Sequence, residues 1–289
     1  MVILSFVCAL ILSLLASVLA EPKAIAKDLD RSKQMMIAAK ILDPQGYFLI
    51  LDKQGKAIPA MYLPGGRLEP GSVNDIATQN QLLEVYKKRL VPMLVNDEGD
   101  LISFKDANVN EDEYVNSYRK SGYYQLPTKL IYKILPNSSV DIEKANDHHS
   151  VEGYVIPVNG FGLWDAIYGY LAIEPNGDTV IGITWYDQKE TPGLGANIAD
   201  PPWQGLFPGK LIFQESLNGK TDFKTAPLGI TVVKGRVSEV LGNSPKAKSA
   251  VDGMAGATLT GNGVTDAYKN VLNAYRPFLI KLHKIEFKE

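Results

Sequence analysis

Two strand-like runs joined by a turn are the feature that most restricts the fold of this chain. Residues 168–173 and 179–186 are rich in β-branched and aromatic residues, and Glu174–Asp178 between them contains Pro, Asn and Gly. This pattern predicts a β-hairpin, because the turn residues reverse the chain while the flanking runs suit a half-buried sheet. Helical patterns occur on both sides of the hairpin. We therefore expect an α+β fold with an antiparallel sheet flanked by helices.

Apolar residues at three- and four-residue spacing predict three helices around that sheet. The first covers Pro22–Leu42, and the second covers Ser72–Leu90, with Ser72 and Asp75 placed like a capping box at its start. The third follows Gly263, where residues 264, 267, 268, 271, 272 and 275 are apolar. Further short strands are expected at 47–51 and 130–135.

The first twenty residues contain no charged side chain and are dominated by Leu, Val, Ile and Ala. As a helix they would extend roughly 30 Å, about the thickness of the hydrocarbon core of a bilayer. A cleaved signal peptide is the alternative, with Val18–Ala20 as its cleavage site, but a basic n-region is missing and the apolar run is long. We expect a retained transmembrane helix. Basic residues follow it at Lys23, Lys27, Arg31 and Lys33, which by the positive-inside rule would place this flank in the cytoplasm.

These signals divide the chain into four parts. Residues 1–20 form the transmembrane helix, and residues 21–45 a membrane-proximal helix or stalk. Residues 46–150 form the N-terminal part of a soluble α+β domain, and residues 151–289 the part that carries the candidate binding motifs.

Composition excludes several classes of function. The 30 basic and 32 acidic residues give no excess of positive charge for nucleic acid. Cys8 is the only cysteine, and it lies in the apolar segment, so neither a disulfide scaffold nor a CxxC metal site can form. The three histidines have no metal-ligand spacing, and no catalytic triad, paired-carboxylate site or P-loop is visible.

The run Asp252–Thr260 is the strongest candidate for a binding site. Small residues at positions 255–257 let the backbone approach a ligand, and a helix follows. A loop that leads into a helix N-terminus presents free N–H groups and the positive end of a dipole, which suits a phosphate. The same residues are also compatible with a glycine-rich turn before a surface helix capped by Thr260 or Asn262.

This run resembles the D-x-x-(S/T)-G-A-T motif of the flavin-bearing membrane subunits of Na+-translocating NADH:quinone reductase and Rnf complexes. Asp252, Gly256, Ala257 and Thr258 match the motif, whereas Ala255 stands where the family has Ser or Thr. The resemblance implies that Thr258 carries FMN through a phosphoester bond. It also implies that a separate flavin transferase installs the FMN from FAD.

Two further segments resemble the same family. Glu190–Gly195 reads Glu-Thr-Pro-Gly-Leu-Gly, which in the family lies over the isoalloxazine, and its two glycines allow the loop to lie flat against a planar ligand. Gly162–Trp164 reads Gly-Leu-Trp and resembles the branch of the family found in the sodium-translocating complex, more than the Rnf branch. Trp164 is a candidate wall of the flavin pocket, although such a tryptophan is also typical of a core. Lys234 is a candidate cation for the phosphate or the reduced flavin.

The resemblance implies an electron-transfer subunit of a Na+-translocating NADH:quinone oxidoreductase, anchored in the bacterial inner membrane with its domain on the periplasmic side. Its partners would be the other subunits, the flavin transferase and membrane lipid, with no nucleic acid. The subunit would have no catalytic residue and no metal of its own. Two alternatives remain, an Rnf-type subunit and a membrane-anchored, non-redox adaptor with a degenerate flavin site. The residues expected to bind FMN are Thr258, as the covalent attachment point, and Leu163, Trp164, Glu190, Thr191, Gly193, Leu194, Gly195, Lys234, Asp252, Gly256, Ala257, Leu259 and Thr260.

Overall fold

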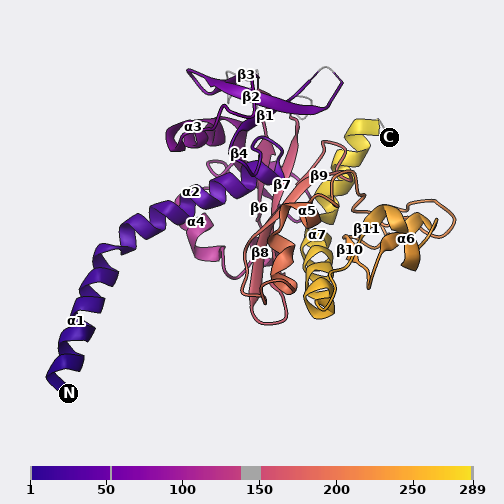
Figure 1. Cartoon of the computed structure of the whole chain (residues 1–289). Helices are drawn as coiled ribbons and strands as arrows, with labels where there is room; N and C mark the ends of the chain where they lie inside the picture. Colours follow the sequence, from indigo (N-terminus) through magenta and orange to yellow (C-terminus); the bar gives the residue numbers. More distant parts are fainter. Residues whose placement is uncertain (1, 53, 138–150, 288–289) are drawn as a thin grey trace.

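The centre of the molecule is a six-stranded sheet in which every neighbouring pair is antiparallel (Figure 1). The computed structural model describes residues 2–52, 54–137 and 151–287. The strand order is β5-β4-β6-β7-β8-β9. The strands are β4 (Leu90–Val95), β5 (Leu101–Ile102), β6 (Lys129–Ile134), β7 (Gly153–Phe161), β8 (Ala166–Ile173) and β9 (Val180–Asp187). The predicted α+β class and the predicted hairpin, formed by β8 and β9, are confirmed.

Two smaller sheets and ten helical segments complete the described structure. The smaller sheets are an antiparallel one of β1 (Phe48–Leu51), β2 (Ala57–Leu63) and β3 (Arg67–Pro70), and a parallel pair of β10 (Thr231–Val232) and β11 (Ala250–Val251). The α-helices are α1 (Val2–Val18), α2 (Ala20–Ala38), α3 (Gln79–Arg89), α4 (Glu111–Tyr118), α5 (Pro201–Gln204), α6 (Val237–Val240) and α7 (Thr258–Phe287). The 3-10 turns are η1 (Tyr123–Gln125), η4 (Gly195–Ala199) and η5 (Pro245–Ser249).

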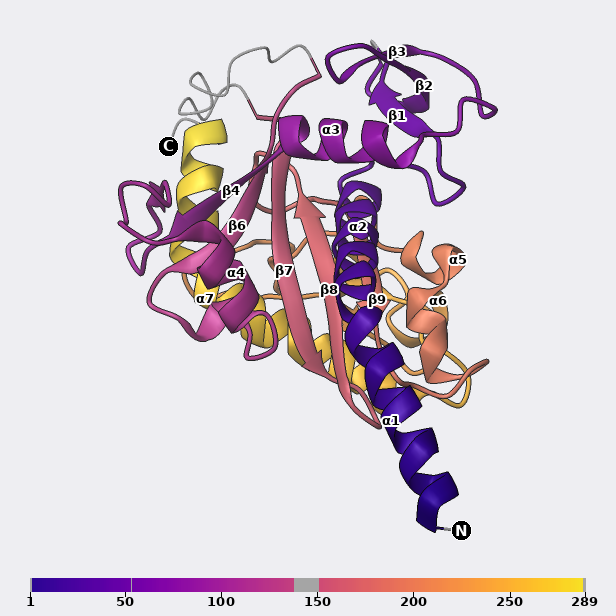
Figure 2. The same ribbon diagram turned by 90° about the vertical axis from the view of Figure 1, so that its left-hand side faces the viewer.

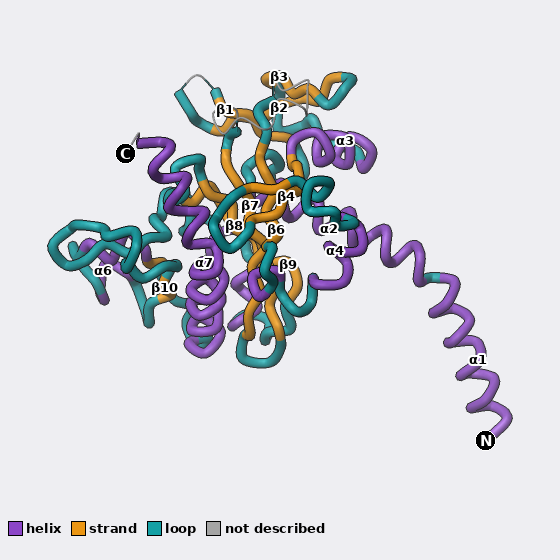
Figure 3. Tube along the Cα trace, turned by 180° about the vertical axis from the view of Figure 1, so that it is seen from behind, coloured by secondary structure: helices purple, strands orange, loops and turns teal. Residues whose placement is uncertain are grey.

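The two faces of the central sheet are covered by different helices. Figure 2 shows α2 in front of β8 and β9, with α7 behind the sheet. Because side chains alternate along a strand, each strand supplies residues to both cores. In β9, Trp185 packs on Tyr268 of α7 with ring centroids 5.5 Å apart, whereas the next residue, Tyr186, belongs to the α2 side. Figure 3 shows α7 from behind, beside α6 and β10.

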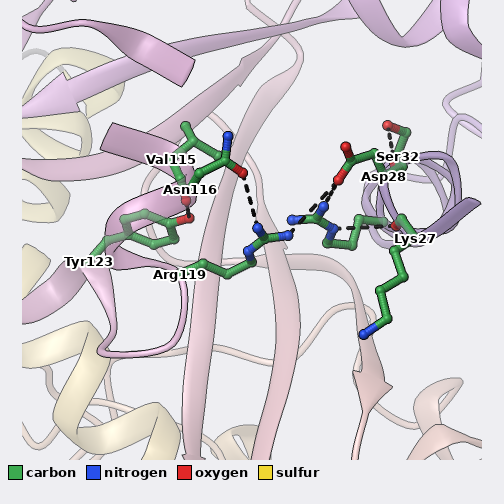
Figure 4. A network of polar contacts seen from close by, with 8 residues as sticks. Lys27, Asp28, Ser32, Val115, Asn116, Arg119 and Tyr123 are labelled. Atoms are coloured by element: carbon green, nitrogen blue, oxygen red, sulfur yellow. Dashed lines mark hydrogen bonds and ion pairs between the residues drawn. The ribbon is translucent and has the colours of Figure 1, made fainter. Parts of the chain in front are cut away.

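Polar contacts join α2 to the α4 region on the outer face of the sheet (Figure 4). Arg119, which follows α4, lies 3.9 Å from the Asp28 carboxylate of α2 and donates a 3.0 Å hydrogen bond to Asn116. Asp28 is also paired with Arg31 one turn along its own helix. These charged groups lie at the edge of the interface, while Met35 and Met36 of α2 are buried against the sheet.

The N-terminal helix α1 projects away from the rest of the molecule (Figure 1). Its side chains from Leu4 to Val18 are exposed. Among the helices of the described residues, none combines the length and the apolar character needed to cross a membrane. The predicted transmembrane helix over residues 1–20 is therefore not confirmed.

Two predicted helix boundaries were wrong. Ser72 and Asp75 do bond, through a 2.7 Å contact from the Ser72 N–H to the carboxylate, but they form a turn, and α3 begins at Gln79. The reason is a complete capping box between Thr78 and Gln81, which satisfies two N–H groups at that later point. The other three predicted elements, around 22–42, 47–51 and 130–135, correspond to α2, β1 and β6.

Helix α7 begins at Thr258, six residues before the predicted start at residue 264. Gly261 and Gly263 therefore lie inside its first two turns. A Cβ atom on Gly263 would lie 2.0 Å from the carbonyl oxygen of Phe161, and one on Gly261 would lie 3.0 Å from Val232. These glycines bring the helix against its neighbours, and the pattern that suggested a helix break instead marks close packing.

Candidate functional site

The three motif segments meet at the carboxylate of Glu190. This side chain accepts hydrogen bonds from the backbone N–H groups of Leu163, at 2.9 Å, and Trp164, at 3.0 Å. It also accepts one from the hydroxyl of Thr260, in the first turn of α7. Glu190 is 5% exposed and Thr260 is 1% exposed. One buried carboxylate thus joins the turn between β7 and β8, the loop after β9 and the start of α7.

Glu190 is ionised because of the donors that surround it. Burial alone raises the pKa of a carboxyl group, but the bonds from Thr260, Trp164 and Leu163 outweigh that effect, and the pKa of Glu190 lies below its ordinary value. A carboxylate that accepts several hydrogen bonds at once can remain charged although it is buried. At neutral pH, Glu190 therefore acts as an acceptor that fixes three loops, and it has no proton to give.

Glycines make this convergence possible. A Cβ on Gly162 would lie 2.5 Å from the Glu190 carboxylate, and one on Gly195 would lie 2.4 Å from the hydroxyl of Thr260. Both distances are too short for any side chain. The glycines of two motifs are thus required by the packing of the loops on one another.

Thr258 is the first residue of α7, and its side chain is exposed. The carbonyl of Ala257 accepts the first helical hydrogen bond, from the N–H of Gly261 at 3.0 Å. Residue 257 is therefore in the capping position, and alanine has no side-chain oxygen with which to cap the helix. The first-turn N–H groups and the positive end of the helix dipole remain directed toward the region around the Thr258 hydroxyl.

The loop Glu190–Gly195 lies against the loop that precedes Thr258. Gly256 has a φ of +72°, and a Cβ there would lie 2.9 Å from the Cδ2 atom of Leu194. Gly193 also has a positive φ, +75°, and faces open space. The left-handed conformation and the close contact both favour glycine at position 256.

Apolar side chains are exposed on the three segments that Glu190 joins. Trp164 is 68% exposed and its indole N–H donates to the Thr191 hydroxyl at 3.1 Å. Leu163, Leu194 and Leu259 are also exposed. Trp164 is thus a surface residue held by one hydrogen bond, whereas a core position was the alternative expected from the sequence.

The remaining predicted residues lie on the segments next to Thr258. Asp252 accepts a 2.7 Å hydrogen bond from the N–H of Val237 at the start of α6, and its own carbonyl accepts from the indole of Trp203. Lys234 is exposed in the turn after β10. That turn packs on the motif loop, because a Cβ on Gly253 would lie 2.0 Å from the carbonyl oxygen of Val233.

The arrangement fits a planar cofactor attached through a phosphate. It offers an exposed hydroxyl at an uncapped helix N-terminus, apolar side chains beside it and a lysine on the neighbouring turn. Glu190 and Thr260 were predicted to bind the cofactor, whereas the structure pairs them with each other beneath the surface. The signal that could have found this pairing is the pair of glycines at 162 and 195, which leave space for one shared carboxylate.

Comparison with known proteins agrees with this geometry. Residues 162–273 match the FMN-binding domain family. The NqrC protein of the Na(+)-translocating NADH-quinone reductase of Chlamydia caviae is 42% identical over 295 residues, which cover 99% of this chain and 92% of that protein. The corresponding protein of Vibrio parahaemolyticus is 31% identical, over 96% of this chain and 91% of that protein. The crystal structure of Shewanella oneidensis NqrC aligns with a TM-score of 0.50 and 29% identity, covering 71% of this chain and 89% of that one. The crystal structure of the equivalent protein from Parabacteroides distasonis, at 21% identity and a TM-score of 0.52 over 88% of this chain and 92% of that one, is similar in fold.

Proposed function

This chain belongs to the NqrC family of Na+-translocating NADH-quinone reductase subunits, and from that premise we propose that it is the FMN-carrying electron-transfer subunit of such a complex. The observation that carries the proposal is the exposed Thr258 at the uncapped start of α7, where the three motif segments converge. The whole complex would be an oxidoreductase that passes electrons from NADH to quinone, coupled to sodium transport.

The chain's own residues would hold the cofactor. Thr258 supplies the oxygen of a phosphoester, and the first-turn N–H groups with Lys234 offset the phosphate charge. Leu163, Trp164 and Leu194 supply apolar surface for the ring. Bound FMN would supply the redox chemistry. Because the pKa of Glu190 lies below its ordinary value, this carboxylate has no proton to give at neutral pH.

We propose that a separate flavin transferase attaches the FMN. In that reaction the Thr258 oxygen forms a bond to the FMN phosphorus of FAD, the pyrophosphate P–O bond breaks, AMP leaves and the hydroxyl proton is lost to a base of the transferase. The exposure of Thr258 supports this step, because a second enzyme must reach the hydroxyl. Ala255, which replaces the hydroxyl residue of the family motif, is also exposed and has no packing role that would block the reaction.

We further propose that α1 anchors the protein in the bacterial inner membrane. Its seventeen residues would extend about 26 Å, they carry no charge, and those with described side chains expose them. We place the domain on the periplasmic side on the strength of the family resemblance. A C-terminal alkaline phosphatase fusion is expected to be active, whereas activity of a cytoplasmic reporter fused there would contradict this orientation.

The decisive experiment is mass spectrometry of the full-length protein, co-expressed with a flavin transferase. The peptide that contains Thr258 is expected to gain the mass of an FMN phosphoester, and yellow colour is expected to survive denaturation. Thr258→Ala should abolish both, while Thr225→Ala, in an exposed loop outside the motifs, should abolish neither. An unmodified peptide in the presence of an active transferase would overturn the proposal and favour the non-redox adaptor.

A further inference from the structure

A cavity lies between residues of the three-stranded sheet and residues of the central sheet, and these two sheets are neighbours in Figure 1. Its volume is about 540 Å³, which is within the range of small-molecule sites. None of the residues of the three motif segments lines it. Its walls come from β1, β2, β6 and β9, from the end of α2 and from the loop at Pro208–Gly209.

The apolar part of the cavity wall is aliphatic. They include side chains that lie on five separate parts of the chain: Ile41, Leu49, Leu51, Ile134, Ile181 and Pro208. Among the described residues that line it, none is aromatic. A flexible hydrocarbon chain matches such a surface, whereas a planar ring would find nothing on which to stack.

Arg89 is the polar group that distinguishes the cavity from a packing defect. It is the last residue of α3, it lines the cavity, and it is only 4% exposed. Its Nε atom donates to the carbonyl oxygen of Leu135, and Nη2 pairs with the Glu152 carboxylate at 2.5 Å. Its Nη1 atom is buried and has no acceptor in the part of the chain that the structure describes. A buried charged donor without an acceptor is costly, so Nη1 favours a ligand that brings an oxygen.

The neighbouring carboxylates are already engaged. Glu152 accepts from Nη2 of Arg89, and Glu174 accepts a 3.2 Å hydrogen bond from the side-chain amide of Asn176. Lys40 supplies a second positive charge at the cavity wall. The two cations and the two carboxylates that line the cavity balance in charge, so the preference for a carboxylate ligand rests on Nη1 of Arg89, because a guanidinium pairs with a carboxylate more strongly than with a neutral oxygen.

We propose that this cavity binds an aliphatic carboxylate, which accepts a hydrogen bond from Nη1 of Arg89 while its hydrocarbon chain lies against the aliphatic walls. The hydrocarbon chain follows from the aliphatic walls, and the head group follows from the unsatisfied guanidinium. The site is independent of the flavin, because its residues and those of the motifs do not overlap.

The test uses calorimetric titration of the full-length protein in nanodiscs with decanoate, after subtraction of the heat measured with empty nanodiscs. We expect saturable binding of one decanoate, about tenfold weaker binding of octanoate because two methylenes are lost, and no saturable binding of decylamine. Absence of saturable decanoate binding, or equal binding of decylamine, would overturn the proposal.

Two variants locate the site. Ala57 is exposed at the cavity wall, so Ala57→Phe should fill the cavity without disturbing the core and should weaken decanoate binding at least tenfold. Arg89→Lys keeps the charge but loses the branched donor, and it should weaken binding by a similar factor. Arg67→Lys changes an exposed arginine of β3 that does not line the cavity, and it should leave binding unchanged. Unaltered binding by Ala57→Phe would place decanoate elsewhere and refute the assignment.

Discussion

The two faces of the central sheet are built in different ways. On the α7 face, the loops approach one another closely: glycines at 162 and 195 leave room for the side chains of Glu190 and Thr260, and glycine at 263 leaves room for the backbone of Phe161. On the α2 face, tyrosines keep the elements apart and line a cavity of about 470 Å³. These tyrosines are Tyr86, Tyr123, Tyr132, Tyr168, Tyr170 and Tyr186. The difference indicates that the α7 face depends on exact loop positions, whereas the α2 face depends on a network of bulky, hydrogen-bonding side chains.

The buried tyrosines of the α2 face are uncharged. Tyr170 and Tyr186 stack with centroids 5.0 Å apart, and their hydroxyls are hydrogen-bonded to each other. Burial raises the pKa of Tyr86 and of Tyr186 to about 12. These hydroxyls are therefore protonated near neutral pH and act as hydrogen-bonding groups, while the α7 face is organised by a charged carboxylate.

The largest effect is expected from Gly263→Ala on the α7 face. The new Cβ would lie 2.0 Å from the carbonyl oxygen of Phe161, so either α7 or the end of β7 must move. Overpacking of this severity costs about 3 kcal/mol, and the helix propensity gained by replacing glycine offsets about 1 kcal/mol of it. Urea unfolding should show a net loss of about 2 kcal/mol, and FMN incorporation should fall severalfold. Asn262→Ala, exposed in the same turn, is the control, and wild-type FMN content in Gly263→Ala would show that close approach is unnecessary.

Glu190→Gln tests the carboxylate that joins the three loops. The amide has the same shape but only one oxygen, so it cannot accept all three donors and presents an NH₂ group to an N–H. A hydrogen bond to a charged group contributes about 1.5–3 kcal/mol, and we expect a loss of about 1.5 kcal/mol in urea unfolding. Glu98→Gln, at an exposed position outside the motifs, is the control for the loss of one negative charge alone. An unchanged urea midpoint in Glu190→Gln would show that the hydrogen bonds of this carboxylate to the three loops do not stabilise the fold.

The same carboxylate gives the α7 face a defined pH dependence. Because the pKa of Glu190 is lower in the folded than in the unfolded state, its contribution is complete above the ordinary pKa of a glutamate. That contribution is lost as the pH falls from there through the folded pKa. We expect urea midpoints of the wild type to decline more steeply than those of Glu190→Gln below pH of about 4.3. If the urea midpoints of the two proteins declined in parallel with pH, the lowered pKa of Glu190 would be contradicted.

On the α2 face, Tyr170→Phe should have a smaller effect. The change removes one hydroxyl and leaves the stacked ring, so the loss is that of one buried hydrogen bond, about 1 kcal/mol. FMN content should remain at the wild-type level, because Tyr170 lies on the opposite side of the sheet from the motifs. Tyr168→Phe is the matched control, since the Tyr168 hydroxyl makes only a 3.4 Å contact with the Lys120 carbonyl. Loss of FMN in Tyr170→Phe would show that the two faces are coupled.

The same difference explains how much could be predicted from the sequence. The motifs of the α7 face could be predicted because their residues are contiguous in the sequence, as in Gly256–Thr258 and Gly162–Trp164. A run of this kind can be recognised without knowing the fold. The hairpin could be predicted because its two strands and its turn follow one another in the sequence. By contrast, Tyr86, Tyr132 and Tyr170 come from three elements that become neighbours only in the folded sheet, and each alone is an ordinary amphipathic position. The start of α7 was missed because glycine signals both helix breaking and close packing, and only the position of Phe161 decides between them.

The smallest effect is expected where α2 meets the α4 region. Asp28 and Arg119 are 3.9 Å apart at the surface, and Asp28 already pairs with Arg31. Exposed pairs of this kind contribute about 0.2–1 kcal/mol, and salt screens them. A double-mutant cycle of Asp28→Asn and Arg119→Gln should therefore give a coupling of about 0.3 kcal/mol in low salt, with less in high salt and no change in FMN content. A coupling above about 1 kcal/mol would mean that the position of α2, and with it the N-terminal helix, is set by charge. A value near the expected one means that the buried methionines hold α2 on the sheet, because they remain when the charges are removed.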